Sequence, residues 1–131
     1  MKAYWDSGAL VQASADLQLR TRLHEERGFT RTHALAEIFS ALTGGRLAIR
    51  LESDAAFKVV DNLAADLDFV DLEPKEVLSA LKQAQQRGVR GGRVHDYLHA
   101  RAAEKCGAPG LLTTDQYDFT SLTDSVNVAV I

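Results

Sequence analysis

Short blocks of apolar residues along the chain are separated by amphipathic stretches, a pattern that predicts strands alternating with helices. The clearest helix is predicted over residues 33–43. One wide face of that helix gathers Ala34, Leu35, Ile38, Phe39, Ala41 and Leu42. Residues 2–5 (KAYW) and 110–114 (GLLTT) read as short strands. Strands that alternate with helices imply a parallel sheet with helices on both faces.

Residues that start and stop helices bound the other predicted elements. Further helices are expected over residues 8–14, 16–27, 53–66, 74–87 and from Gly91-Gly92 to 106, and further short strands near residues 29–31, 69–70 and 126–131. Ser7 and Thr32 are the predicted N-caps, and Gly28 is the predicted end of the second helix. Residues 47–51 are compatible with an extended segment.

Composition indicates one globular domain over residues 1–131. Apolar residues make up 46% of the chain and charged residues 25%. Cys106 has no second cysteine to pair with, which fits a reducing compartment. Asp6 interrupts the N-terminus, so we expect no secretory signal there, and the apolar runs are too short to span a bilayer. We therefore expect a soluble, cytoplasmic protein.

Four carboxylates lie at positions from which they can converge on one binding site. Asp6 directly follows the strand at residues 2–5, and Asp115 directly follows the strand at 110–114. Ligands of parallel sheets bind beyond the carboxyl ends of the strands, so the two acids meet if the strands are neighbours. Glu37 and Asp96 lie beside alanines on their helices and are expected to be partly buried.

Burial disfavours an ionised carboxylate unless a cation or hydrogen-bond donors compensate, so these acids suit a Mg²⁺ site. Such an ion can activate water for phosphodiester hydrolysis. The structural alternative is that the aspartates are turn residues or helix caps and that Glu37 is solvated.

The net charge of −3 comes from 15 basic and 18 acidic residues. If Asp6, Glu37, Asp96, Asp115 and also Asp118 share a metal site, the rest of the chain carries 15 basic against 13 acidic groups. A nucleic-acid substrate is then compatible with the acidic total, whereas tight non-specific binding is disfavoured.

The segment His95-Asp96-Tyr97-Leu98-His99 is similar to the zinc-protease pattern H-E-x-x-H. Aspartate is one methylene shorter than glutamate, and no third ligand stands at the usual spacing. We therefore expect His95 and His99 to be residues of the helix surface, one of them near a nucleic-acid substrate. His33 is expected at a solvated helix start, with a role beside the metal ligands or the substrate as the alternative.

Basic residues near these acids are candidates for contacts to phosphate. Arg46 and Arg50 follow the predicted helix at 33–43, and Arg90 and Arg93 flank the Gly-Gly turn. Arg93 is the best candidate, because it stands one helical turn before Asp96. We assign Arg46 and Ser7 to substrate binding as well. Ordinary solvated charges are the alternative for the arginines. Tyr4 and Trp5 are expected in the sheet core. For Tyr97, both a core position and stacking on a base of the substrate are open.

Four motifs in sequence order carry a family resemblance. They are Trp5-Asp6-Ser7-Gly8-Ala9-Leu10, the segment from Thr32 to Thr43 around Glu37, Gly91-Gly92-Arg93-Val94-His95-Asp96, and Leu111-Leu112-Thr113-Thr114-Asp115-Gln116-Tyr117-Asp118-Phe119. Over nearly its whole length the chain resembles the PIN-domain ribonucleases, most closely the VapC-type toxins. One departure is Gly8, where the family frequently has a second small hydroxyl residue after the first aspartate.

The resemblance implies a three-layer α/β/α sandwich with a central, mainly parallel sheet. It also implies a Mg²⁺- or Mn²⁺-dependent endoribonuclease that forms a homodimer and is inhibited by a cognate antitoxin. Asp6, Glu37, Asp96 and Asp115 match the catalytic positions. Asp6, Asp96 and Asp115 match metal ligands, and Asp118 matches a more variable acidic position. Two other functions stay open: a PIN nuclease of RNA processing, and a regulatory module that acts through an antitoxin complex on DNA.

Overall fold

A computed structural model describes residues 1–45, 48, 50–115 and 119–131. In this part of the chain, five parallel strands form one sheet in the order β3-β2-β1-β4-β5. The strands are β1 (Ala3–Trp5), β2 (Gly28–Thr30), β3 (Leu67–Phe69), β4 (Gly110–Thr113) and β5 (Asn127–Val130). They are short, and the helices between them supply most of the mass on either side of the sheet.

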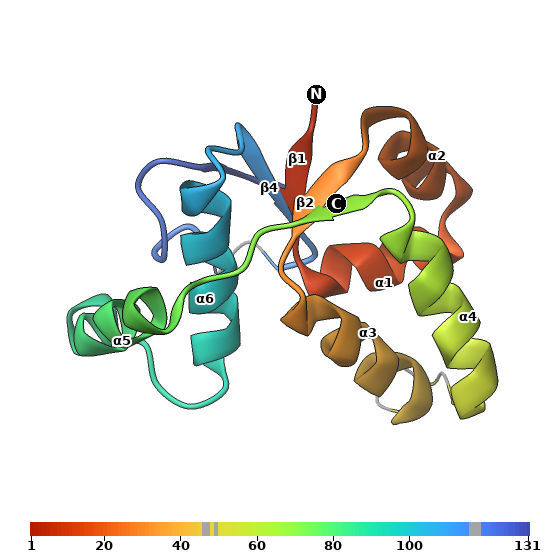
Figure 1. Cartoon of the computed structure of the whole chain (residues 1–131), viewed down its shortest axis with the longest axis horizontal. Coiled ribbons are helices and arrows are strands. Elements are labelled where there is room, and N and C mark those ends of the chain that lie inside the picture. The colour runs from red at the N-terminus through yellow and green to blue at the C-terminus, as the bar shows by residue number, and fades with distance from the viewer. Residues whose placement is uncertain (46–47, 49, 116–118) are drawn as a thin grey trace.

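Helices cover both faces of the sheet (Figure 1). On one side lie α1 (Ser7–Ala15), α2 (Leu17–Glu26), α3 (His33–Thr43) and α4 (Ser53–Ala64). On the other side lie α5 (Pro74–Lys82), the 3₁₀ turn η1 (Ala84–Arg87) and α6 (Arg93–Lys105). The predicted three-layer α/β/α sandwich is therefore confirmed. No helix in the described ranges is both long enough and apolar enough to cross a membrane.

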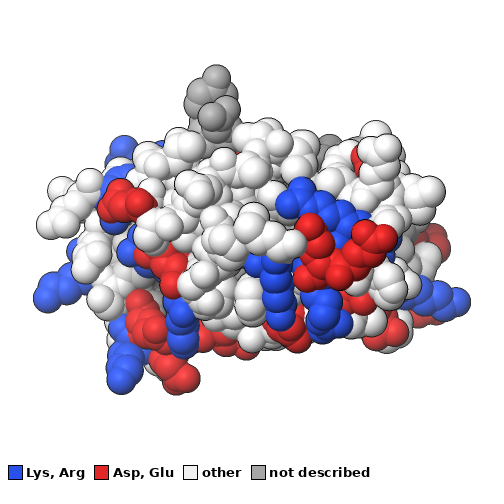
Figure 2. Space-filling model, turned by 90° about the horizontal axis from the view of Figure 1, so that it is seen from above, with Lys and Arg blue, Asp and Glu red and all other residues white. Residues whose placement is uncertain are grey.

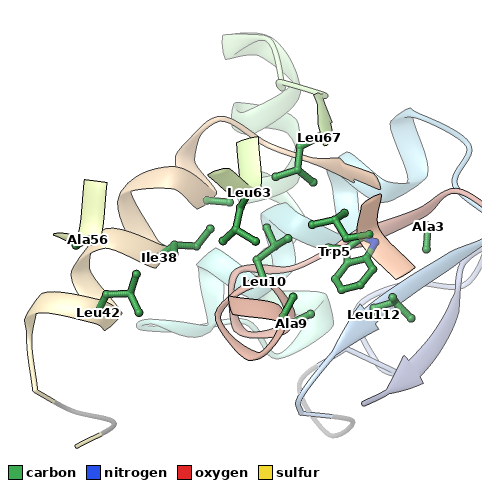
Figure 3. Close-up of a cluster of buried hydrophobic side chains, with 13 residues drawn as sticks. Ala3, Trp5, Ala9, Leu10, Ile38, Leu42, Ala56, Leu63, Leu67 and Leu112 are labelled. Atoms are coloured by element: carbon green, nitrogen blue, oxygen red, sulfur yellow. The ribbon is translucent and has the colours of Figure 1, made fainter. Parts of the chain in front are cut away.

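The alternation of side chains along the central strands divides the interior into two cores. In β1, Ala3 and Trp5 face the core under α1 to α4, and Tyr4 faces the core under α6. In the same way, Leu112 and Leu111 of β4 enter opposite cores. Figure 3 shows the first core, in which leucines of the helices pack toward the Trp5 ring. Tyr4 and Trp5 are thus core residues, as predicted.

The sheet register brings two of the predicted site residues to one edge. β1 pairs with β4, with Tyr4 opposite Leu111 and Trp5 opposite Leu112. The pairing continues past the strand, because the Asp6 N–H donates to the Leu112 carbonyl over 3.1 Å. The segments after these two neighbouring strands, which carry Asp6 and Asp115, therefore leave the same edge of the sheet.

Two predicted helix boundaries and one predicted cap bond differ from the structure, each for a local reason; the helix predicted over residues 33–43 has the predicted bounds, with Thr32 at its N-cap position. Asp6, and not Ser7, is the N-cap of α1, since its Oδ1 accepts the Ala9 N–H at 2.7 Å. The Thr32 side chain makes no cap bond to α3, because its hydroxyl donates to Asp71 at 2.6 Å. The helix predicted over residues 74–87 ends at Lys82 and continues as η1.

Gly28 was predicted to end a helix, but it is the first residue of β2. The residue after α2 is Arg27, with φ of 57°. A Cβ atom on Gly28 would lie 2.7 Å from Trp5 Cδ1. This glycine is therefore required by the close approach of the Trp5 ring. Of residues 47–51, positions 48, 50 and 51 are not in a strand, and 47 and 49 lie outside the described residues.

Candidate active site

Asp6 is a buried carboxylate at the carboxyl end of β1. Its residue is 5% exposed. Burial raises the pKa of Asp6, and the nearby negative charge of Glu37 adds to this rise. Hydrogen bonds from the Thr113 hydroxyl and the Ala9 N–H, and the neighbouring His99, lower the pKa without cancelling the rise. A divalent cation placed beside Asp6 would therefore favour its ionised form.

Glu37 comes from the middle of α3 and reaches toward the same place. Its side chain is 21% exposed, and its Oε1 accepts a hydrogen bond from His99 Nε2 at 2.9 Å. Burial raises the pKa of Glu37. The hydrogen bond from His99, together with the neighbouring His33 and His95, outweighs that effect and holds the pKa below its usual value. Glu37 is therefore a carboxylate that stays ionised at neutral pH.

His99 connects Glu37 to the sheet. It is 1% exposed, so the prediction of a helix-surface residue is wrong. Its Nδ1 lies 2.6 Å from the Tyr4 hydroxyl oxygen. Burial raises the pKa of Tyr4, so the hydroxyl keeps its proton and can donate it to Nδ1. With that tautomer, the Nε2–H of His99 donates to Glu37, and one hydrogen-bonded chain links β1, α6 and α3.

The sequence carried a signal for this burial. Residues Tyr97, Leu98, Ala100, Ala102 and Ala103 surround His99 on α6, and all are buried. A histidine within such an apolar and alanine-rich turn lies on a helix that is covered nearly all round. The spacing similar to H-E-x-x-H indicates only that His99 shares a helix face with His95.

His33 and His95 complete a second group with Glu37. One donor atom of each of these three residues lies within 4.8 Å of the others. The two imidazole rings are stacked, with centroids 5.5 Å apart and an interplanar angle of 19°. Both residues are exposed, as predicted. The sequence placed His33 one turn before Glu37 but gave no reason to bring His95 to the same point.

An open cleft borders these residues. It encloses about 660 Å³ and is lined by Ser7, His33, Ala36, Glu37, Ser40, Ala41 and His95. A second hollow, of about 280 Å³, shares Ser7, Glu37 and Ala41 with it and includes Thr114. Ser7 therefore lies where a substrate-binding residue was predicted. Gly8, beside Ser7, lies close to Thr114. A Cβ atom at this position would lie only 2.8 Å from Thr114 Oγ1, so a larger residue would be crowded there.

Asp96 and Asp115 lie at the same end of the molecule. Asp96 is in the first turn of α6, next to His95 and three residues before His99. The Asp115 N–H donates to Thr113 Oγ1 at 3.0 Å, and the nearby Thr113 hydroxyl lowers the pKa of Asp6. Thr113 thus ties the segments that follow β1 and β4 together. The structure brings Asp6 and Glu37 close to each other and places Asp96 and Asp115 on neighbouring elements.

Arg93 and Tyr97, two further candidates, make contacts outside this group. Arg93 Nη2 donates to Ser121 Oγ at 2.5 Å, so its guanidinium already binds the segment before β5. The Tyr97 hydroxyl donates to the Ala80 carbonyl at 3.0 Å inside the core between α5 and α6. Asp118 and Arg46 lie outside the described residues.

The opposite edge of the sheet is occupied by ion pairs. Arg20 pairs with Asp66 at 2.8 Å, Arg27 pairs with Asp68 at 3.1 Å, and Lys2 also pairs with Asp68. Figure 2, viewed from the side on which the N-terminus lies, shows basic and acidic side chains interspersed on this face. The charges at the amino ends of the strands are thus matched locally, whereas the site at the carboxyl ends gathers acids and histidines.

Comparisons with known proteins bear on the fold. No family model matches the chain, and no curated protein matches it. Among solved structures, the chain is similar to PAE2754 from Pyrobaculum aerophilum, with a TM-score of 0.73 and 18% sequence identity. The match covers 98% of this chain and 89% of that chain. At this identity the likeness shows that the two chains share the α/β/α fold.

Proposed function

We propose that this chain is a metal-dependent endoribonuclease, the toxin of a toxin–antitoxin pair. The observation that carries the proposal is the buried carboxylate of Asp6, whose pKa is raised by burial and by Glu37. A divalent cation relieves the repulsion between two such acids. That the substrate is RNA rests on the family resemblance alone.

The donors available at this edge fit Mg²⁺ or Mn²⁺. Asp6, Asp96 and Asp115 offer oxygen atoms, which hard divalent cations prefer. Asp118, outside the described residues, is the fourth ligand that we expect. When bound, such an ion supplies positive charge for the phosphate and lowers the pKa of a water molecule.

The chain's own residues then have separate roles. Glu37 remains ionised and is oriented by His99, so it can accept a proton or a hydrogen bond from a water in the cleft. Ser7 is the first residue of α1 and lines the cleft. Its hydroxyl can donate a hydrogen bond to a phosphate oxygen. The guanidinium of Arg93 already donates a hydrogen bond to Ser121. To contact a phosphate it must break this bond or use its other N–H groups.

A cleavage assay on total RNA tests the proposal. Wild type should degrade RNA with Mg²⁺ or Mn²⁺ and stop when EDTA is in excess. Asp6→Asn, Glu37→Gln and Asp96→Asn should each abolish cleavage while the circular dichroism spectrum stays unchanged. Asp61→Asn, which removes an exposed acid of α4, is the matched control and should cleave normally. Degradation that persists in EDTA or in all three site variants would sink the proposal.

The biological setting needs its own experiment. A toxin should arrest growth when it is expressed alone, and co-expression of a small protein encoded just upstream should relieve the arrest. A nuclease of RNA processing should not need such a partner, and a regulatory module should bind DNA only with it. Sedimentation at increasing protein concentration tests the proposed homodimer.

A further inference from the structure

We propose that His33, Glu37 and His95 form a binding site for Zn²⁺, distinct from the all-carboxylate site although it shares Glu37. Zinc binding itself is independent of the proposed nuclease function. Only its predicted effect on cleavage rests on that function.

The geometry brings three donors from two helices to one point. His33 and Glu37 are four residues apart on α3, so they share one face of the helix. His95 reaches them from the first turn of α6, and the three donor atoms lie within 4.8 Å of one another. In a tetrahedral zinc site with bonds of roughly 2.0–2.1 Å, the donors are about 3.4 Å apart. The donors must therefore close by at most about 1.4 Å, which the exposed imidazoles can do by side-chain rotation.

The chemistry of this donor set differs from that of the acidic set. Two imidazoles and one carboxylate suit zinc, whereas Mg²⁺ prefers oxygen ligands and retains water. Three protein ligands leave a fourth position open, and here that position faces the cleft of about 660 Å³ that the three residues line. A site of this kind binds zinc with one exchangeable water or substrate atom.

Glu37 is oriented before any ion arrives. Its Oε1 is held by the buried His99, and His99 is held in turn by the Tyr4 hydroxyl. Hydrogen bonds that fix a ligating carboxylate typically change metal affinity by roughly 10- to 100-fold. When zinc binds, the exposed His33 and His95 therefore move toward Glu37, whose carboxylate is already oriented by the buried His99.

Sharing Glu37 makes the two sites antagonistic. A carboxylate bound to zinc between His33 and His95 no longer serves the acidic site beside Asp6. We therefore expect Zn²⁺ to inhibit Mg²⁺-dependent RNA cleavage.

Titration of the whole protein with ZnCl₂, followed by calorimetry in the absence of RNA, tests the binding site. Wild type should bind one Zn²⁺ per chain. His33→Ala and His95→Ala should each weaken binding by more than the roughly 10- to 100-fold expected for a residue that only orients a ligand. His24→Ala removes an exposed histidine of α2, and Cys106→Ser removes the thiol; both should bind as wild type does.

Absence of zinc binding by wild type, or equal binding by wild type and both histidine variants, would overturn the inference. Because His33 and His95 are exposed, their alanine variants are expected to keep the wild-type unfolding temperature, which is measured in parallel. Cleavage assays separate the two proposals. Zinc that binds to a chain without RNase activity refutes the nuclease alone, whereas cleavage by wild type without histidine-dependent zinc binding refutes the zinc site alone.

Discussion

Asp6 has two roles that a single substitution can separate. Its side chain caps α1, and its charge is buried beside Glu37. A carboxyl whose pKa is raised in the folded state stabilises the fold at low pH and loses that contribution as pH rises through the folded pKa. At neutral pH the raised pKa of Asp6 therefore costs stability, compared with a carboxyl of ordinary pKa at the same place.

Asp6→Asn should thus unfold at a higher temperature than wild type at pH 7 in EDTA, although it cannot cleave RNA. Asparagine is an equally good N-cap, so α1 keeps its first turn. Differential scanning calorimetry in EDTA measures the change. With Mg²⁺ added, wild type should gain stability and the variant should not. A lower unfolding temperature for the variant in EDTA would contradict this account of Asp6.

Tyr4 sets the tautomer of His99, because its hydroxyl donates a hydrogen bond to Nδ1 and leaves the proton of the imidazole on Nε2. Tyr4→Phe leaves the buried His99 Nδ1 without its donor, and we expect a loss of about 1–3 kcal/mol in the free energy of unfolding. Tyr97→Phe is the matched control, because it removes a buried hydroxyl that donates only to Ala80 O. Urea denaturation should show similar losses for both variants. Only Tyr4→Phe should also slow cleavage, and equal activity of the two variants would argue against the link to Glu37.

At the scale of single elements, the start of β2 depends on its contact with β1. Gly28 lies against the edge of the Trp5 ring, and Trp5 is fully buried among α1, α2 and β4. A side chain on Gly28 cannot be accommodated by moving the ring outward. Gly28 therefore determines how closely β2 approaches β1. Because α3 follows β2 in the chain, the position of α3 depends on this approach as well.

Gly28→Ala should reduce the free energy of unfolding by about 1–3 kcal/mol, the range typical of overpacked cores. Gly92→Ala is the control: its added Cβ would meet nothing within 4 Å, and the φ of Gly92 is −62°. Urea denaturation followed by Trp5 fluorescence measures both variants. Equal stability of Gly28→Ala and wild type would show that Trp5 can move, against the close packing that the structure describes.

At the scale of the whole molecule, charge is divided between the two edges of the sheet. Asp66, at the amino edge, is held by Arg20 at 2.8 Å and His24 at 3.2 Å. Burial raises the pKa of Asp66, but the hydrogen bonds from Arg20 and His24 outweigh it and leave the pKa below its usual value. A lowered pKa stabilises the fold above the usual pKa, and this contribution is lost as pH falls through the folded value.

Asp66→Asn should therefore unfold at a lower urea concentration than wild type at pH 7. The expected loss in the free energy of unfolding is about 1.5–3 kcal/mol, the range typical of hydrogen bonds to charged groups. At pH values below the lowered pKa of Asp66, the two proteins should converge. This pH dependence is opposite in sign to that of Asp6. A difference that persists unchanged under acid would indicate that Asp66 acts through packing and not through its charge.

Local patterns in the sequence were enough for much of this protein. The periodicity over residues 33–43, the short apolar blocks and the Gly-Gly turns predicted the alternating elements and the three-layer fold. Because strand-end residues of a parallel sheet share an edge, the sequence also predicted that Asp6 and Asp115 meet if their strands are neighbours, and that Glu37 is partly buried; the pairing of β1 with β4 came from the structure. These features depend on residues close in the chain and on the regularity of α/β sheets.

Only the tertiary structure decided the features that depend on contacts between distant segments. Gly28 lies next to Trp5 across the sheet, and Thr32 is bound by Asp71, so neither acts as the local pattern suggested. His99 is buried between Tyr4 and Glu37, and the ring of His95 stacks on that of His33, because α6 packs against β2 and β4 on the face of the sheet from which Tyr4 projects. A helix shows in its sequence which residues share a face, but the residues that this face meets are set by the sheet order and by the crossing of distant helices.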